Sequence, residues 1–181
     1  MQKRWDLSLG VLDLSVNAIR AGARSLLISI DEPGDGTLRL TVEDDGRGME
    51  EDVLRRAADP GFTTRVSGEG GMGLAWAKAL ARRTGGRFSL RSLPQWGTRV
   101  ELLIRMDHSE APPFGEMAET VATLLLTDGQ TEVFYRHRCG DRLLHCSTAA
   151  EKLRTGSEAA AFLQIRERLG RELSALRTPN L

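Results

Sequence analysis

Three polar side chains near the amino terminus, Asp13, Asn17 and Arg20, have a spacing of four and then three residues. In a helix this spacing places them on one stripe. Asp13 and Asn17 could orient a water and hold one position of a hydrated Mg²⁺, which takes oxygen ligands. An arginine one turn further on could contact phosphate oxygens. Taken alone, the stripe favours a solvated helix face.

A second candidate is the loop Asp44-Asp45-Gly46-Arg47-Gly48-Met49, which follows a predicted strand. An aspartate at a strand end can accept a hydrogen bond from an exocyclic amine such as the 6-amino group of adenine. The glycines would let a flat base lie against the backbone. An ordinary turn is the alternative interpretation.

A third candidate is the stretch GEGGMGL, residues 68–74, which has four glycines directly before a predicted helix. Such a run allows backbone N–H groups to approach phosphate at a helix N-terminus. Residues 59–71, which overlap the start of this stretch, are polar and Gly-rich without an apolar period, which is typical of a lid or a disordered loop. A flexible surface loop is the alternative.

Regular elements must position these segments. The first predicted helix has an apolar stripe that we expect to be buried, formed by Trp5, Leu9, Leu12, Val16 and Ile19. Strands over residues 25–31 and 37–43 form a hairpin around the turn at 33–36. The other expected elements are helices over 50–57 and 74–83 and strands over 88–93 and 99–105.

The composition changes over residues 106–116, which contain two prolines and scattered charges. We therefore expect a boundary there, with one unit over 1–106 and a small extension over 107–181. In the extension we predict a helix (116–126), a hairpin (132–138 with 142–146) and a long helix (158–176). Ser157 is the expected N-cap of the last helix.

Taken in order, the segments DLSVN, DDGRG, PGFTTR, GEGGMGLAWAK and GTRVELLI resemble the GHKL, or Bergerat-fold, ATP-binding family. That family includes type II topoisomerases, the ninety-kilodalton heat-shock chaperone, histidine kinases and mismatch-repair ATPases. The resemblance covers residues 8–105. It implies an α+β fold, a two-layer sandwich with helices on one face of a mixed, mostly antiparallel sheet, followed by the small α+β extension.

The resemblance also implies ligands and roles. ATP and Mg²⁺ would bind, with Asn17 as the metal ligand, Asp44 on the adenine amino group and Asp13 as the general base. The remaining nucleotide contacts implied are Arg20, Gly46, Gly48, Met49, Thr63, Thr64, Arg65, Gly70, Gly71, Met72, Gly73, Leu74 and Thr98. Of these, residues 63–65 would belong to the ATP lid, and Gly70, Gly71 and Gly73 would wrap the phosphates.

Two positions depart from the family pattern. Asp13 replaces the usual glutamate of the hydrolytic branch and is one methylene shorter, while a base must come within about 2.6–3.2 Å of its water. Either the backbone shifts to compensate, or hydrolysis is slow. Glu69 replaces a glycine that is usual in the kinase version, so the lid could be held differently.

Three functions stay open on the sequence. The first is a Mg²⁺-ATP module with weak ATPase activity, whose lid closure signals to a protein partner. The second is a protein kinase acting in trans, and the third is a nucleotide sensor without chemistry. About a dozen residues precede Asp13, so we do not expect the histidine-bearing hairpin of histidine kinases. The chain is also similar to ATP-binding proteins encoded with iron-only hydrogenase subunits, which suggests a hydrogenase-related or regulatory partner.

The composition restricts the binding partners and the cellular location that we expect. The 181 residues include 25 basic and 25 acidic side chains, so nothing demands nucleic acid or a membrane as a partner. No apolar run approaches the roughly 20 residues of a membrane span, and we expect a cytoplasmic protein. His137, Cys139, His145 and Cys146 could suggest zinc, but one of them would face away across the hairpin, so ordinary strand residues are favoured.

Overall fold

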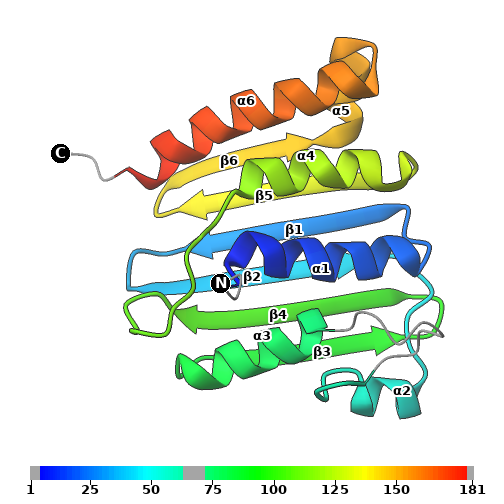
Figure 1. Cartoon of the computed structure of the whole chain (residues 1–181), viewed down its shortest axis with the longest axis vertical. Coiled ribbons are helices and arrows are strands. Elements are labelled where there is room, and N and C mark those ends of the chain that lie inside the picture. The colour runs from blue at the N-terminus through cyan, green and yellow to red at the C-terminus, as the bar shows by residue number, and fades with distance from the viewer. Residues whose placement is uncertain (1–4, 63–71, 179–181) are drawn as a thin grey trace.

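The computed structural model describes residues 5–62 and 72–178, which build a six-stranded sheet in the order β3-β4-β2-β1-β5-β6 (Figure 1). Every neighbouring pair is antiparallel except β1 and β5, which run parallel. The strands are β1 (Ser25–Glu32), β2 (Thr37–Asp44), β3 (Arg87–Leu93), β4 (Gly97–Arg105), β5 (Glu132–Cys139) and β6 (Arg142–Ser147).

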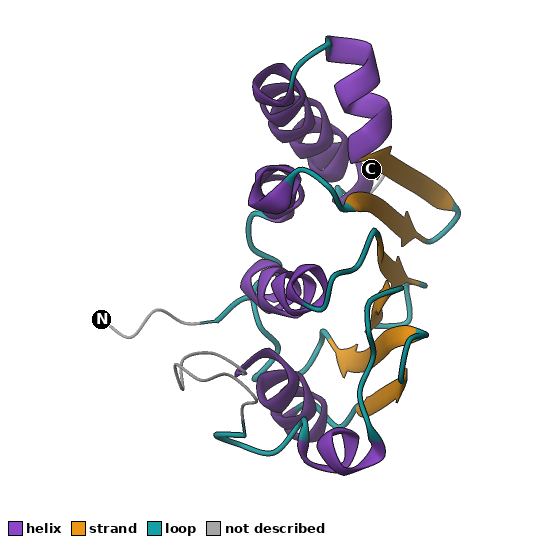
Figure 2. Ribbon diagram, turned by 90° about the vertical axis from the view of Figure 1, so that its right-hand side faces the viewer, coloured by secondary structure: helices purple, strands orange, loops and turns teal. Residues whose placement is uncertain are grey.

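Helices α1, α3, α4 and α6 lie over one face of this sheet (Figure 2). The helices are α1 (Leu7–Arg20), α2 (Glu51–Arg56), α3 (Met72–Arg83), α4 (Met117–Asp128), α5 (Thr148–Thr155) and α6 (Glu158–Arg177). Alternating apolar residues of the strands face the helices and form one continuous core with them. The predicted α+β sandwich with a mixed, mostly antiparallel sheet is therefore confirmed. Helix α5 was not predicted.

The predicted buried stripe of α1 is confirmed only at Ile19 and is wrong at its other four positions. Trp5 precedes the helix, because Asp6 is the N-cap and accepts a hydrogen bond from the Leu9 amide at 2.9 Å. The fully buried apolar residues of α1 are instead Leu7, Val11, Leu14, Ala18 and Ile19, whereas Leu9, Leu12 and Val16 are only partly buried. Helix α1 lies between α3 and α4 and contacts both of them. Its second apolar face therefore packs against these neighbouring helices instead of the sheet.

The extension continues the sheet of the first part. Strand β5 pairs along the whole length of β1, from Ser25 opposite Glu132 to Glu32 opposite Cys139. The Thr131 hydroxyl also donates to the Ala23 carbonyl at 2.7 Å. Residues from both sides of position 106 share the same hydrophobic cluster. The division into two units stays a prediction. Ser157 caps α6 as expected, accepting from the Ala160 amide at 3.2 Å.

A buried polar network ties the end of α6 to β1 and β5. The fully buried His137 places Nε2 2.7 Å from a carboxylate oxygen of Glu32 and Nδ1 3.0 Å from the Tyr135 hydroxyl. Arg177 donates to the same oxygen of Glu32 at 3.0 Å and lies over the ring of Phe114. Both ring nitrogens of His137 therefore have protein partners.

The network makes a prediction about acid stability. Burial opposes ionisation of Glu32, but hydrogen bonds from His137 and Arg177 outweigh it and hold its pKa below the ordinary 4.5. The ionised carboxylate therefore stabilises the folded state above that value, and the stabilisation is lost as the pH falls through the lowered pKa. We expect Glu32→Gln to lower the free energy of unfolding by about 1–3 kcal/mol at pH 7.

Urea unfolding at pH 7 and pH 4 measures this effect, and the difference between variant and wild type should be smaller at pH 4. Glu132→Gln, in the neighbouring strand, is the control, because it removes a carboxylate outside this network. A difference that stays the same or grows toward pH 4 would contradict the role of the Glu32 charge.

Candidate functional site

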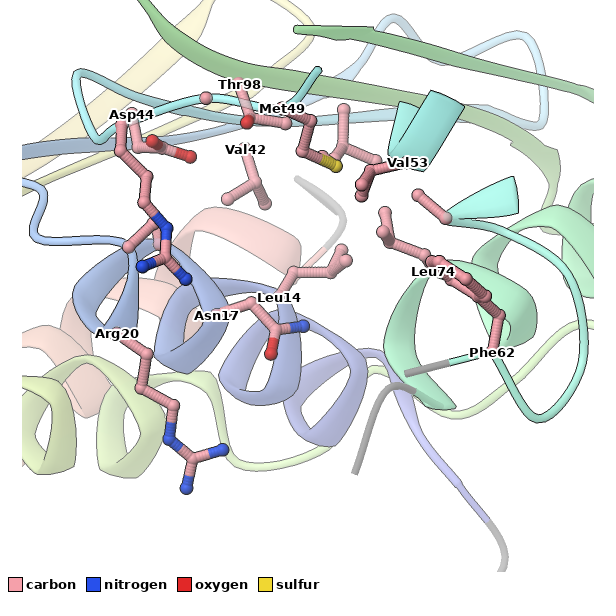
Figure 3. A pocket seen from close by; sticks show the side chains of 16 residues that line it. Leu14, Asn17, Arg20, Val42, Asp44, Met49, Val53, Phe62, Leu74 and Thr98 are labelled. Carbon is pink, nitrogen blue, oxygen red and sulfur yellow. The ribbon is translucent and has the colours of Figure 1, made fainter. Parts of the chain in front are cut away.

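A cavity of about 270 Å³ opens where the carboxyl end of α1 approaches the end of β2 and the start of β4. Helix α2 and the first turn of α3 close its other side (Figure 3). Its volume is just below the roughly 300–1,000 Å³ typical of ligand pockets. Seven of the predicted site residues line it: Asn17, Arg20, Asp44, Gly48, Met49, Leu74 and Thr98.

Asp44 is the acidic group of this cavity. It ends β2 directly opposite Thr98 of β4, and its Oδ1 accepts a hydrogen bond from the Gly46 amide at 2.8 Å. Burial raises the pKa of this half-buried carboxyl, and hydrogen bonds from the backbone amides of Gly46 and Thr98 offset the shift only in part. A carboxylate that is partly removed from water is stabilised when a ligand N–H group donates a hydrogen bond to it.

Gly48 in the loop after β2 and Gly97 at the start of β4 are required by the packing of the chain itself. Gly48 has φ +65°, and a Cβ there would lie 1.9 Å from the Leu93 carbonyl oxygen. Gly97 has φ +87°, and its Cβ would lie 1.8 Å from the carbonyl oxygen of Asp44. The loop and the β3–β4 turn are therefore in backbone contact, which fixes the Asp44 end of the cavity.

Sequence reasoning missed most of the apolar lining. This apolar wall consists of Leu14, Ala18, Ala21, Val42, Val53, Ala57, Phe62 and Val100, and the charged Arg47 also lines the cavity. In a sequence these apolar residues look like ordinary core positions of a helix or strand, so only their nearness to Asp44 in the fold identifies them. They provide the apolar surface that a flat aromatic ring needs, beside a few polar groups that can orient it.

The α1 side of the cavity carries the polar groups of the predicted metal and phosphate contacts. Asn17 lies across the cavity from Asp44 and Thr98, and the exposed Arg20 extends away from both (Figure 3). An amide oxygen suits Mg²⁺, which is held by one or two protein oxygens while phosphates and waters complete its octahedron. The residues present thus have the donor chemistry for the ion.

Asp13 has a different position from the other predicted residues. Its Oδ2 accepts a hydrogen bond from the Gly73 amide at 2.7 Å, and a Cβ on Gly73 would lie 2.4 Å from that oxygen. Asp13, Met72 and Gly73 are not among the described residues that line the cavity. The carboxylate instead ties α1 to the first turn of α3, where exposed amides favour negative charge.

The other lid residues in the prediction, Thr63, Thr64, Arg65, Gly70 and Gly71, lie outside the described residues. Leu74, one residue after Gly73, lines the cavity, so the first turn of α3 borders the site. Within residues 5–62 and 72–178, no helix is long and apolar enough to cross a membrane.

Comparison with known proteins agrees with this geometry. Residues 3–108 match the family described as histidine kinase-, DNA gyrase B- and HSP90-like ATPase. The match covers more than half of the 181 residues, and the chain belongs to this family. Its ATPase domain binds ATP in general.

Curated relatives include sensor histidine kinases. ZraS of Escherichia coli O157:H7 is 33% identical over 107 residues, which are 58% of this chain and 23% of that protein. GtrS of Pseudomonas aeruginosa is 37% identical over 87 residues, 48% of this chain and 18% of that protein. The matched region thus spans about a fifth of each relative. Among solved structures, the N-terminal domain of a DNA repair protein shares the fold, with a TM-score of 0.54, 14% identity and coverage of 77% of this chain and 51% of that one.

The raised pKa of Asp44 makes a prediction about stability. Because the folded protein binds a proton at Asp44 more tightly than the unfolded chain does, the ionised carboxylate destabilises the empty protein at pH 7. This cost disappears as the pH falls toward the ordinary pKa of 3.8. We expect Asp44→Asn, which keeps an oxygen for the Gly46 amide, to raise the thermal midpoint at pH 7.

Thermal unfolding between pH 7 and pH 4 measures the difference in thermal midpoint between Asp44→Asn and wild type. This difference should become smaller as the pH falls to 4. Asp45→Asn is the matched control, because it removes the charge of the adjacent carboxylate. That carboxylate already accepts hydrogen bonds from the Arg24 and Ser25 amides at 2.8 and 2.9 Å. A loss of stability in Asp44→Asn at pH 7 would contradict the cost assigned to the charge.

Proposed function

We propose that the chain is a Mg²⁺-dependent ATP-binding module with weak ATPase activity, whose lid closure signals to a protein partner. The observation that carries the proposal is the half-buried Asp44 carboxylate in an apolar cavity, opposite Asn17 of α1. A carboxylate in such a place accepts a hydrogen bond from the adenine amino group. The apolar lining then covers the faces of the base.

The polar side chains follow the expected order of the ligand. With adenine at Asp44 and Thr98, the phosphates would extend to the α1 side of the cavity, where Asn17 and Arg20 lie (Figure 3). Asn17 would give one oxygen to Mg²⁺, and the bound ion would neutralise charge on the phosphates. The guanidinium of Arg20 would contact phosphate oxygens.

The hydrogen bond between Asp13 and Gly73 supports a coupling between chemistry and lid position. In the proposal Asp13 also takes a proton from the attacking water, and it lies one turn of α1 before Asn17. A carboxylate that holds the first turn of α3 changes its hydrogen bonding when it accepts a proton. Hydrolysis would therefore alter the attachment of α3 and of the lid before it.

A protein kinase acting in trans is the second candidate. It is supported by the relatives, since ZraS and GtrS are named as sensor histidine kinases and are 33% and 37% identical to this chain over the matched segments. In that case the γ-phosphoryl group would pass to a side chain of another protein instead of water.

Incubation with γ-labelled ATP and Mg²⁺ distinguishes these functions. Label released as inorganic phosphate supports the ATPase, and label on an added partner supports the kinase. If ATP binds and is returned intact, both chemistries are excluded and a nucleotide sensor is left. If ATP does not bind at millimolar concentration, the whole proposal fails.

Asn17→Ala tests the metal ligand. We expect it to abolish the Mg²⁺-dependent part of ATP binding, because an alanine offers no oxygen to the ion. Calorimetry with ATP in Mg²⁺ and in EDTA measures that part, and the EDTA arm is the control, in which variant and wild type should agree. An unchanged affinity in Mg²⁺ would remove Asn17 from this role.

Asp13→Asn tests the base. The asparagine oxygen can still accept from the Gly73 amide, so the contact between α1 and α3 is retained while proton acceptance is lost. We expect turnover to fall about a hundredfold, within the range of a general base, while nucleotide affinity stays the same. Phosphate release and ADP calorimetry measure the two properties, and equal turnover would refute the assignment.

A further inference from the structure

One face of the sheet is turned away from α1, α3, α4 and α6 (Figure 2). The side chains on that face surround a hollow of their own. Its volume is about 200 Å³, and its floor is made by two small side chains, Ser29 of β1 and Thr41 of β2. These two residues are direct neighbours across the strands. The larger side chains around them leave the middle of the sheet surface hollowed.

Arginines surround this floor. Four of them line the hollow, Arg39, Arg99, Arg136 and Arg138, against two carboxylates, Asp31 and Glu101. Arg136 is the neighbour of Ser29 on β5, and Arg39 is the neighbour of Asp31 on β2. The formal net charge of the whole chain is zero, so this face concentrates positive charge locally.

The carboxylates neutralise only part of that charge. Arg138 binds Asp31 through two hydrogen bonds of 2.9 and 2.7 Å, and Arg99 bridges Glu43 and Glu101. Among residues 5–62 and 72–178, neither Arg39 nor Arg136 has an ion-pair partner within 4.0 Å. The hydrogen bond from Arg138 lowers the pKa of Asp31, and the charges of Arg39 and Arg136 lower it further, so both guanidinium groups lie within electrostatic reach.

The hydroxyl groups of the floor add polar donors. Thr41 is almost fully buried and Ser29 half-buried, and within the described part of the chain neither hydroxyl is hydrogen-bonded. A hydroxyl can donate one hydrogen bond, and an arginine can donate in pairs. The hollow therefore offers two hydroxyl groups, Ser29 beside Arg136 and Thr41 beside Glu101 in the neighbouring strands, together with the guanidinium groups of Arg39 and Arg136.

We propose that this hollow, formed by Ser29, Thr41, Arg39 and Arg136, binds a phosphate monoester or free phosphate dianion. A tetrahedral dianion presents enough oxygens to engage both guanidinium groups and the floor hydroxyls at once, whereas a carboxylate has only two. The volume holds such a group but is below the size of whole-ligand pockets. The site is on the sheet face opposite the nucleotide cavity and is independent of it.

Nuclear magnetic resonance of the ¹⁵N-labelled full chain tests the site. Inorganic phosphate is added without nucleotide at constant ionic strength, and we expect saturable shifts of the Ser29, Thr41 and Arg136 amides. Shifts that stay linear with concentration, or that miss these amides, would overturn the proposal. Because the readout is local to β1, β2 and β5 and uses no nucleotide, it does not depend on ATP binding, so the two proposals fail separately.

Matched variants show whether the site is specific. We expect Arg136→Gln to weaken phosphate binding at least tenfold and the double variant Arg39→Gln/Arg136→Gln to abolish it. The control is Arg91→Gln, an exposed arginine of β3 that does not line the hollow. Equal weakening by the control would show diffuse charge attraction and would overturn the site. All three positions are exposed, and unchanged spectra elsewhere confirm folding.

Ligand variants identify the source of the dianion. Tighter binding of O-phosphoserine than of inorganic phosphate supports a phosphorylated side chain as the ligand. Equal or tighter binding of inorganic phosphate supports a free anion. Acetate binding as tightly as phosphate would refute the assignment to a tetrahedral dianion.

Discussion

The site depends on one unfavourable interaction, the partial removal of the Asp44 carboxylate from water. The charge is tolerated because the amides of Gly46 and Thr98 donate to it, and those amides are in place because the loop after β2 packs against the β3–β4 turn. The folded protein thus holds an acceptor whose hydrogen bonding a ligand can complete. A residue placed this way costs stability in the empty protein and gains interaction energy when a suitable donor arrives.

The rest of the molecule keeps that acceptor in position. β2 is the third strand of the sheet, with β4 on one side and β1 on the other, so its end cannot move without disturbing both neighbours. Opposite it, α1 is held by the sheet and by contacts with α3 and α4. The cavity is therefore bounded by an ordered strand end on one side and an ordered helix on the other.

Much of this could be predicted from the sequence, for identifiable reasons. The order of strands and helices along the chain follows from apolar periods and turn residues. The resemblance of the motifs to a known family is what points to Asn17, Asp44 and Thr98. The buried face of α1 could not be predicted, because the helix is apolar on two sides and only its tertiary neighbours decide which side meets the sheet. The residues of the cavity wall could not be predicted either, since in the sequence Val42 and Phe62 cannot be distinguished from ordinary core residues. The bond between Asp13 and Gly73 joins residues sixty positions apart, and no local pattern reports it.

The parallel pairing of β5 with β1 has a consequence for the edge of the sheet. Without β5 and β6, one whole edge of the eight-residue strand β1 would present the unpaired backbone groups of alternate residues to solvent, over an apolar core. An open strand of that length is a template for pairing with other chains. By occupying it, residues 132–139 move the exposed edge outward to the shorter β6, where Arg142 and His145 interrupt the apolar sequence. The added hairpin therefore protects the protein against edge-to-edge aggregation.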